Sequence, residues 1–333
     1  MNSYCFVLKF KTPLGTPLKG DTLFGHICWQ IAYDKGLFNR SIEELLSNYE
    51  QSPFCVVSSG FPVIKHNDRY FFLFPKPSLP LEMLFADQLS DDDDFIKNRK
   101  IYKKKKWMIL DNSKGNLKNA GYFTDKEVLN EFFGSDIDGL IKDFSYVHNA
   151  LQRTSFSTSS EGFAPFSVYN SCFHPDLYTG IVVCSYEENL KALQKTFERI
   201  GKIGFGRDAS TGLGKFELVD SVLFDIKNFG AENPQALYTL SPSFVNPDEF
   251  KECYFIPFIR YGKHGDILAK ARNPFKNPVV MLDEGAILIP KSKEKFQLPY
   301  VGKALRGISL SFDKTVHQGY SPYIPVSLEG NDD

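Results

Sequence analysis

The sequence predicts an α+β protein with two tandem ferredoxin-like (RRM-like) domains, the first with a large insertion and the second degenerate. Over residues 1–224, the apolar patterns follow the order strand, helix, strand, strand, helix, strand once an insertion and one short helix are set aside. A glycine-rich loop separates the last helix from the last strand. Residues 236–333 are rich in strand patterns and poor in helical ones, which indicates a degenerate copy.

Each element of the first unit has a local signal. Strands are predicted where apolar residues alternate, and helices where they recur every three or four positions. Asp21 or Thr22 can cap the first long helix, and its N-terminus would then face whatever binds near Lys19 and Gly20. The predicted elements are strands at 4–11, 54–63, 69–75, 177–185 and 215–224, and helices at 21–33, 41–48 and 187–200.

We predict domain boundaries at 1–225 and 236–333, joined by a turn-rich segment. The insertion spans about 76–143 and is interpreted as an added segment or mobile arm outside the core. It carries an acidic run at 91–94 and a basic run at 97–106, followed by Trp107. The basic run is either a solvated face or a nucleic-acid contact, and neither alternative is favoured. In the second unit, strands are predicted at 236–240, 252–261, 279–289 and 304–312, followed by a closing segment at 317–326.

Composition limits the class of protein. The 333 residues carry a net charge of −1, with 42% hydrophobic and 24% charged residues, as in soluble globular proteins. Such a balance argues against binding nucleic acid by global charge, so any polyanion site must be local. The six cysteines are scattered, without a CxxC pair or clustering with histidine, which indicates reduced thiols and no metal site. We therefore expect a cytoplasmic protein with no cofactor and no membrane partner, because no apolar run is long enough to span a bilayer.

The glycine-rich loop at 200–217 carries the strongest functional signal. Its five glycines alternate with basic and hydroxyl side chains, and glycine amides can approach an anion closely. A dinucleotide-binding fingerprint needs the order strand, loop, helix, which is the reverse of the order here. The P-loop pattern also fails, because Phe216 follows Lys215. We therefore predict a local site for a phosphate-bearing ligand other than these nucleotide cofactors, with a flexible turn as the simpler alternative.

Three motifs carry a family resemblance: KGDTLFGHICWQ, HNALQRT followed by SSEGFAPFSVY, and GFGRDASTGLGKFEL. Together they resemble the RAMP (repeat-associated mysterious protein) superfamily of CRISPR proteins. Their order most resembles the subunit that caps the crRNA 5′ end in type III-A (Csm) interference complexes. The resemblance implies a non-catalytic RNA-binding protein whose partners are the crRNA 5′ handle, the large polymerase/cyclase-like subunit and the backbone RAMP subunit. The insertion would correspond to the family's thumb or to a lineage-specific arm.

The resemblance and the loop together define the predicted RNA-binding residues. Asn149, Arg153 and Thr154 match the family's Asn-x-x-x-Arg-x-Thr-like stretch, although Gln152 stands where the family often has Asp. We expect this stretch to lie beside the glycine loop. The full predicted set is Lys19, Gly20, Asp21, His148, Asn149, Arg153, Thr154, Lys202, Gly204, Phe205, Gly206, Arg207, Ser210, Thr211, Gly212, Gly214 and Lys215.

Two other functions remain open. The first is a metal-independent endoribonuclease that processes CRISPR repeat RNA, which needs a general acid and base, usually histidine. The chain has six histidines, none paired closely in sequence, and His26 and His148 are the best candidates. The second is an architectural subunit whose loop packs against a neighbouring protein. RNA binding without catalysis is the function we expect.

Overall fold

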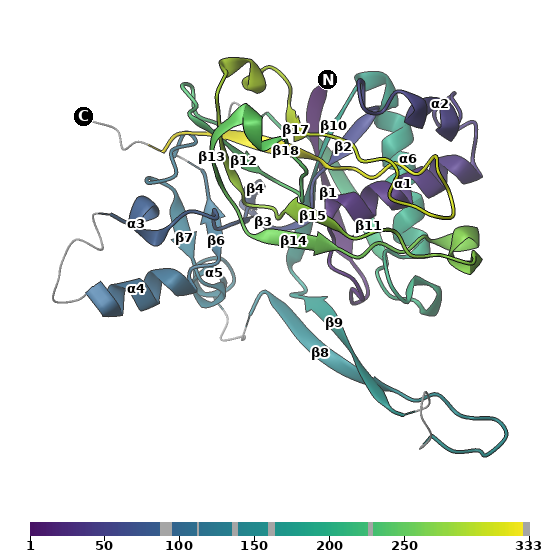
Figure 1. Cartoon of the computed structure of the whole chain (residues 1–333). Coiled ribbons are helices and arrows are strands. Elements are labelled where there is room, and N and C mark those ends of the chain that lie inside the picture. Colours follow the sequence, from purple (N-terminus) through teal and green to yellow (C-terminus); the bar gives the residue numbers. More distant parts are fainter. Residues whose placement is uncertain (87–94, 112, 135–138, 159–163, 226–228, 329–333) are drawn as a thin grey trace.

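The computed structural model describes residues 1–86, 95–111, 113–134, 139–158, 164–225 and 229–328 (Figure 1). Its centre is a six-stranded antiparallel sheet with the order β11-β1-β10-β3-β4, in which β2 also pairs with β10. The strands are β1 (Asn2–Phe10), β2 (Cys55–Val57), β3 (Phe61–His66), β4 (Arg69–Phe72), β10 (Leu177–Ser185) and β11 (Phe216–Leu223). These match the predicted strands, except that 54–63 forms two strands instead of one and 69–75 ends in a separate short strand.

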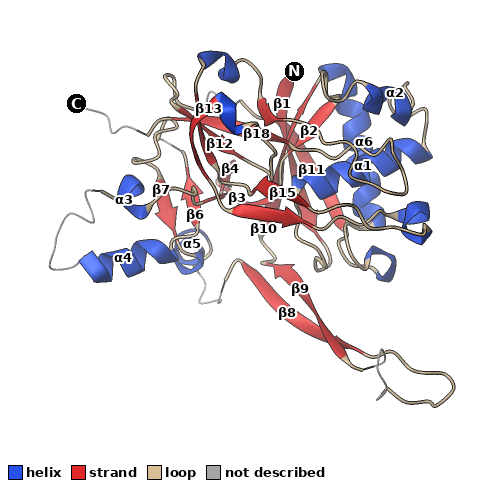
Figure 2. Ribbon diagram, in the orientation of Figure 1, coloured by secondary structure: helices blue, strands red, loops and turns tan. Residues whose placement is uncertain are grey.

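Helices α1 (Gly20–Tyr33), α2 (Ile42–Ser47) and α6 (Leu190–Ile203) gather on one side of this sheet (Figure 2). Helix α6 buries Leu193, Phe197 and Ile200, which recur at helical spacing, and Phe197 meets Phe6 of β1 edge-on at 4.8 Å. A capping box at Ser41 starts α2. The two long helices and the short one are therefore where the sequence predicts them, with α6 preceded by a 3₁₀ turn.

The second half is built from strands. Its five-stranded antiparallel sheet has the order β13-β16-β12-β18-β17, and β14 pairs with β15 in a separate ribbon. The bounds are β12 (Ala236–Thr239), β13 (Phe250–Tyr254), β14 (Pro257–Arg260), β15 (Val279–Leu282), β16 (Ile287–Pro290), β17 (Tyr300–Gly302) and β18 (Tyr320–Val326).

One strand predicted for this half is absent, and its predicted domain type is not confirmed. The predicted strand at 304–312 is wrong, because that segment forms only isolated bridges, such as Leu305 with His317. Within the described part of 236–328, helical turns are 3₁₀ only and no α-helix is present. A degenerate ferredoxin-like domain therefore stays a prediction.

The two halves share one apolar core. A single cluster of buried side chains includes residues of β1 and α1 as well as residues of β12 and β18. Phe74 contacts Tyr238 with ring centroids 6.2 Å apart, and Tyr49 meets Tyr320 at 5.7 Å. The predicted boundary between domains, part of which (226–228) lies outside the described residues, stays a prediction.

The insertion is a folded layer. It contains α3 (Leu81–Leu84), α4 (Phe95–Lys104), β6 (Trp107–Ile109), β7 (Gly121–Phe123) and α5 (Asp125–Phe132), and β6 pairs with β7 and with β5 (Phe74–Pro75). Met108, Val128 and Leu129 are fully buried, so placing the whole segment outside the core is wrong. Lys105 pairs with Glu127 and Lys106 with Asp125, which ties the end of the basic run to α5. The acidic run at 91–94 lies outside the described residues.

A long β-hairpin projects from the body of the molecule (Figure 1). It is formed by β8 (Ile141–His148) and β9 (Phe166–Phe173), paired in register from Ile141–Phe173 to His148–Phe166. Its base is joined to the core by two mutual backbone hydrogen bonds between Leu14 and Ser171, each 2.9 Å. Neither strand of this hairpin is among the elements predicted from the sequence. Among the described helices, none has the length and apolar character needed to cross a membrane.

Candidate nucleic-acid interface

The glycine loop closes tightly on itself. Helix α6 ends at Gly204, whose φ of +111° turns the chain back. The amide of Phe205 donates to the carbonyl of Gly214 at 2.9 Å, and a Cβ on Gly214 would lie only 2.2 Å from the Phe205 oxygen. Phe205 is fully buried and its ring lies 4.8 Å from that of His26 on α1. Most of the loop's glycines therefore serve its own packing, and only Gly212 has open space around its α-carbon.

The loop's amides bind protein atoms. Gly206 donates its N–H to His26 Nε2 at 3.2 Å, and Arg207 donates its own to Thr16 Oγ1 at 2.9 Å. Gly214 and Lys215 donate to Pro13 O and Thr12 Oγ1. These four amides are directed into the protein, so they cannot form the anion clamp that the glycine content suggests.

The outward-facing cations are Lys202 and Lys215. Both are exposed, and neither pairs with a carboxylate among the residues that the structure describes. Ser210 and Thr211 are exposed between them, although the Thr211 hydroxyl donates to Asp208 O at 2.9 Å. This surface can contact phosphates through point charges and hydroxyls.

Arg207 joins the loop to the hairpin. Its Nη2 donates to Tyr169 O at 2.7 Å and to Asn170 Oδ1 at 3.0 Å, and its Nε donates to Asp208 Oδ2 at 3.1 Å. Tyr169 and Asn170 both belong to β9, near its junction with the core. The guanidinium fork therefore fixes the direction of the hairpin relative to the loop.

The stretch at 149–154 does not lie directly beside the loop. Arg207 contacts Tyr169, which pairs with Ser145, whereas Asn149 comes four residues further along the hairpin. At 3.3 Å per residue, that separation is roughly 13 Å. Asn149, Arg153 and Thr154 are exposed beyond the last strand pair, and part of their motif (159–163) is outside the described residues. The hairpin, whose register is set by long-range pairing, carries them away from the loop.

The hairpin presents aromatic side chains that are not among the predicted RNA-binding residues. Tyr169 is 71% exposed and Phe156 is 80% exposed, while His148 stacks on Phe166 with ring centroids 5.6 Å apart. Exposed aromatic rings are what single-stranded nucleic acids use for base stacking. Apolar and polar residues alternate in part of FSVYNSCF, the sequence of β9. This alternation could have predicted the strand and the directions of its side chains.

Three residues of the predicted set lie inside the fold. Lys19 Nζ donates to Asp283 Oδ1 at 2.6 Å and to Glu284 Oε1 at 2.5 Å. Asp21 has a fully buried carboxylate that accepts two hydrogen bonds from Arg260. The amide of Gly20 donates to Ser59 Oγ. Because these groups are occupied by internal partners, Lys19, Gly20 and Asp21 do not belong to the interface that the structure presents.

His26 holds α1 against the glycine loop. Burial lowers the pKa of His26 to about 4, so the ring is neutral at pH 7 and its Nε2 can accept the Gly206 N–H. The other histidine considered for catalysis, His148, lies on the projecting hairpin. Within the described ranges, no three His, Cys, Asp or Glu side chains group as metal ligands, and all six cysteines are free thiols.

The burial of His26 predicts a loss of stability in acid. Its pKa is about 4 in the folded state and near 6.5 in the unfolded state, so below pH 6.5 the unfolded chain binds a proton that the folded chain does not. Between pH 7 and pH 5 this should cost about 2 kcal/mol of unfolding free energy. Urea titrations of the wild type and of His26→Gln, which lacks the titrating ring, should differ in pH dependence by that amount. Parallel pH profiles would contradict the assignment.

No protein-family model matches the sequence, and no curated protein is significantly similar to it. Solved structures with related folds are found. A chain in "Crystal structure of Csm3-Csm4 subcomplex in the type III-A CRISPR-Cas interference complex" is 16% identical, with a TM-score of 0.61, and the match covers 98% of this chain and 100% of that one. Chains in the Csm1-Csm4 cassette with pppApA and with AMPPNP are each 15% identical, with TM-scores of 0.58 and 0.57. The matches cover 98% and 99% of this chain, and 99% and 100% of theirs.

These matches show that the chain shares its fold with a chain of a CRISPR-Cas interference subcomplex. The particular proteins whose fold it shares over nearly its whole length come from structures of Csm4 with Csm3 or Csm1. The resemblance that the three sequence motifs indicate is therefore confirmed at the level of the fold.

Proposed function

We propose that the protein is a non-catalytic crRNA-binding subunit of a type III CRISPR effector complex. In this role it holds the repeat-derived 5′ handle and docks the large polymerase/cyclase-like subunit. The observation that carries the proposal is the full-length fold match to chains of Csm4-containing structures. The solvent-exposed aromatic hairpin, anchored to a loop that exposes Lys202 and Lys215, supplies a surface of suitable chemistry.

The hairpin and the loop have complementary roles in this proposal. Bases of the RNA stack on the exposed aromatic side chains of the hairpin. Near the end of the hairpin, Arg153 and His148 contact the RNA. Lys202 and Lys215 contact phosphates near the body of the molecule. A protein with a net charge of −1 then binds a short RNA segment locally and relies on neighbouring subunits for the rest.

The partners are proposed by analogy with the matched structures. The matched structures are assemblies of two proteins, a Csm3-Csm4 subcomplex and a Csm1-Csm4 cassette. We extend this to the present chain and propose a backbone RAMP subunit and a large subunit as its neighbours.

A salt titration tests the phosphate contacts. Lys202→Ala and Lys215→Ala should each weaken binding of handle RNA and reduce the slope of log K against log salt by about 1, because each removes one released counterion. Fluorescence anisotropy with labelled handle RNA measures both quantities. Lys293→Ala, an exposed lysine in the second half, is the control and should change neither. Unchanged slopes in both loop variants would count against RNA contact at this surface.

Arg207 is expected to act by holding the hairpin. Arg207→Ala removes three side-chain hydrogen bonds, so handle RNA affinity should fall about tenfold and proteolytic cleavage within the hairpin should rise. Asn170→Ala keeps the Arg207 charge but removes one of its partners. If Asn170→Ala also weakens RNA binding without changing the salt slope, Arg207 is a positioning residue. A flattened slope in Arg207→Ala alone would instead make it a phosphate contact.

The absence of catalysis is part of the proposal and has its own test. Repeat RNA incubated with the purified protein in EDTA should remain intact. Specific cleavage that is lost in His26→Ala or His148→Ala would replace the binding proposal with the endoribonuclease alternative. Failure of the protein to bind handle RNA, combined with assembly onto the large subunit, would favour the architectural alternative.

A further inference from the structure

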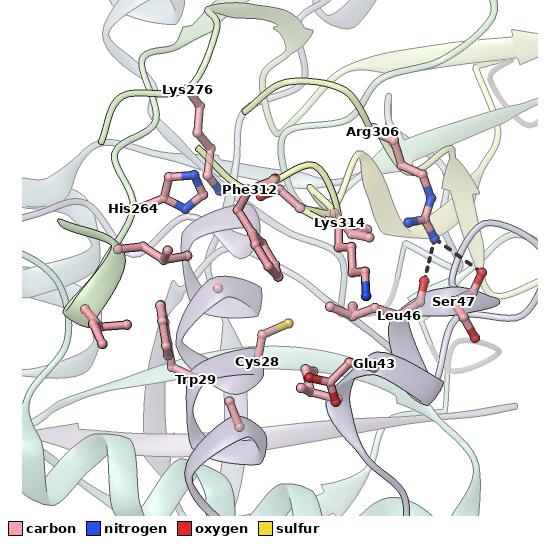
Figure 3. A pocket seen from close by; sticks show the side chains of 17 residues that line it. Cys28, Trp29, Glu43, Leu46, Ser47, His264, Lys276, Arg306, Phe312 and Lys314 are labelled. Atoms are coloured by element: carbon pink, nitrogen blue, oxygen red, sulfur yellow. Dashed lines mark hydrogen bonds between the residues drawn. The ribbon is translucent and has the colours of Figure 1, made fainter. Parts of the chain in front are cut away.

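A cavity of about 790 Å³ opens between helices α1 and α2 and two loops of the second half (Figure 3). Cys28 and Trp29 of α1 and Leu46 of α2 form one wall, while His264 and Phe312 come from the facing loops. None of its lining residues belongs to the surface proposed to bind RNA. The cavity is therefore a separate site, and it lies within the size range of ligand pockets.

The cavity combines an apolar wall with unpaired cations. The wall includes Ile42, Ile267 and Val316, and Ile267 is 72% exposed at its edge. Lys276 and Lys314 also line the cavity, and neither forms a salt bridge with any residue that the structure describes. The third cation, Arg306, is already held by Glu50 Oε1 at 2.7 Å and by the Leu46 carbonyl.

Lys276 is the informative group. Its side chain is partly buried, and desolvation lowers the pKa of its ammonium group. Asp21 and the Cys28 thiol oppose that effect, while Arg260 adds to it, but the Asp21 carboxylate is already occupied by Arg260. A partly buried, unpaired ammonium group is costly unless an anion comes to it. The only carboxylate among the lining residues is Glu43, on the α2 side.

We propose that this cavity docks an acidic, amphipathic segment of a partner protein. The segment inserts aliphatic or aromatic side chains against Trp29 and Phe312 and places carboxylates near Lys276 and Lys314. An apolar centre with a charged rim is the usual anatomy of a protein interface. A phosphate backbone would have to lie against apolar side chains here, so a protein segment is favoured over RNA. The inference rests on the proposed function, which supplies the partners as subunits of the same effector complex.

The test measures affinity for the purified large subunit and for the backbone RAMP subunit. Lys314→Glu reverses the charge of the exposed lysine. Lys276→Met removes the charge of the partly buried lysine. Lys276→Met should not impair folding, because it takes away an ammonium group that has no carboxylate partner among the described residues. We expect each variant to lower affinity for one of the two subunits at least tenfold. Lys293→Glu is the matched exposed control and should stay within twofold of the wild type. Trp29 emission, taken as the difference between the wild type and Trp29→Phe, should shift to the blue on docking.

The outcomes separate the inference from the proposed function. Unchanged affinity for both subunits in both variants overturns the docking site, even if handle RNA binding remains intact. A concentration-dependent dimer that Lys314→Glu disrupts overturns it in favour of a second copy as occupant. If the wild type binds handle RNA but neither subunit, the docking inference fails while RNA binding stands. If it binds none of the three, the proposed function fails as well.

Discussion

Replacing Arg260 with alanine should lower the free energy of unfolding by about 3–5 kcal/mol, the cost of leaving a buried charge without its partner. The Asp21 carboxylate has no exposed surface and accepts hydrogen bonds from Arg260 Nε and Nη2 at 2.5 and 2.6 Å. The next nearest basic group, His317 Nε2, lies 3.4 Å away, and burial lowers the pKa of that ring to about 4. His317 is therefore neutral at pH 7 beside the intact pair, and the Arg260 charge itself helps to keep that ring neutral.

Urea unfolding at pH 7 measures this loss as a shift in midpoint at constant m-value. Arg99→Ala is the matched control, because Arg99 forms an ion pair with Glu82 in which both side chains are about half exposed. Such pairs contribute roughly 0–1 kcal/mol. An Arg260→Ala protein as stable as the control would show that the pair contributes little to holding the two halves together.

Gly214→Ala should be the most damaging substitution in the glycine loop, with an expected loss of about 2–5 kcal/mol from backbone strain and overpacking together. Gly214 has a φ of +69°, and an added Cβ would lie 2.2 Å from the Phe205 oxygen and 2.6 Å from the Phe205 nitrogen. Both contacts are with backbone atoms, which cannot rotate away. Because the same segment supports Arg207 and the base of the hairpin, binding of handle RNA should fall with stability.

Gly212→Ala separates the cost of backbone strain from the cost of overpacking. Gly212 also has a positive φ, +104°, but no heavy atom lies within 4 Å of an added Cβ. Its substitution should therefore cost only the backbone term, about 1–2 kcal/mol. Thermal and urea unfolding of both variants measures the difference. Equal losses at Gly212 and Gly214 would mean that the contact with Phe205 does not limit the loop.

Local periodicity was sufficient to predict most elements of the first half. The strand predicted at 177–185 coincides with β10, and the helix predicted at 21–33 begins one residue early in the structure. Helix α1 buries one face and β10 is an almost continuously buried apolar run, and each of these patterns reports its element directly. The β8–β9 hairpin escaped prediction because β8 is largely exposed and lacks that alternation. The strand predicted at 304–312 is wrong because the segment forms only isolated bridges, and its apolar Leu310 and Phe312 are exposed.

Some features of the candidate site could likewise be predicted from the sequence, and others could not. The sequence identified the helix-loop-strand order, the outward Lys202 and Lys215, and motifs whose fold-level resemblance the solved structures support. It could not show that Lys19 and Asp21 have partners more than 200 positions away, at Asp283 and Arg260.

By itself, then, the sequence determined the local elements and the composition of the loop, because helical and strand periods depend on neighbours within a few residues. Only the tertiary structure decided which groups are free. Four of the loop amides are occupied by Thr12, Pro13, Thr16 and His26, and the hairpin carries Asn149 away from the loop. A buried polar group is satisfied by whichever partner the whole chain brings to it, and that choice has no local signature.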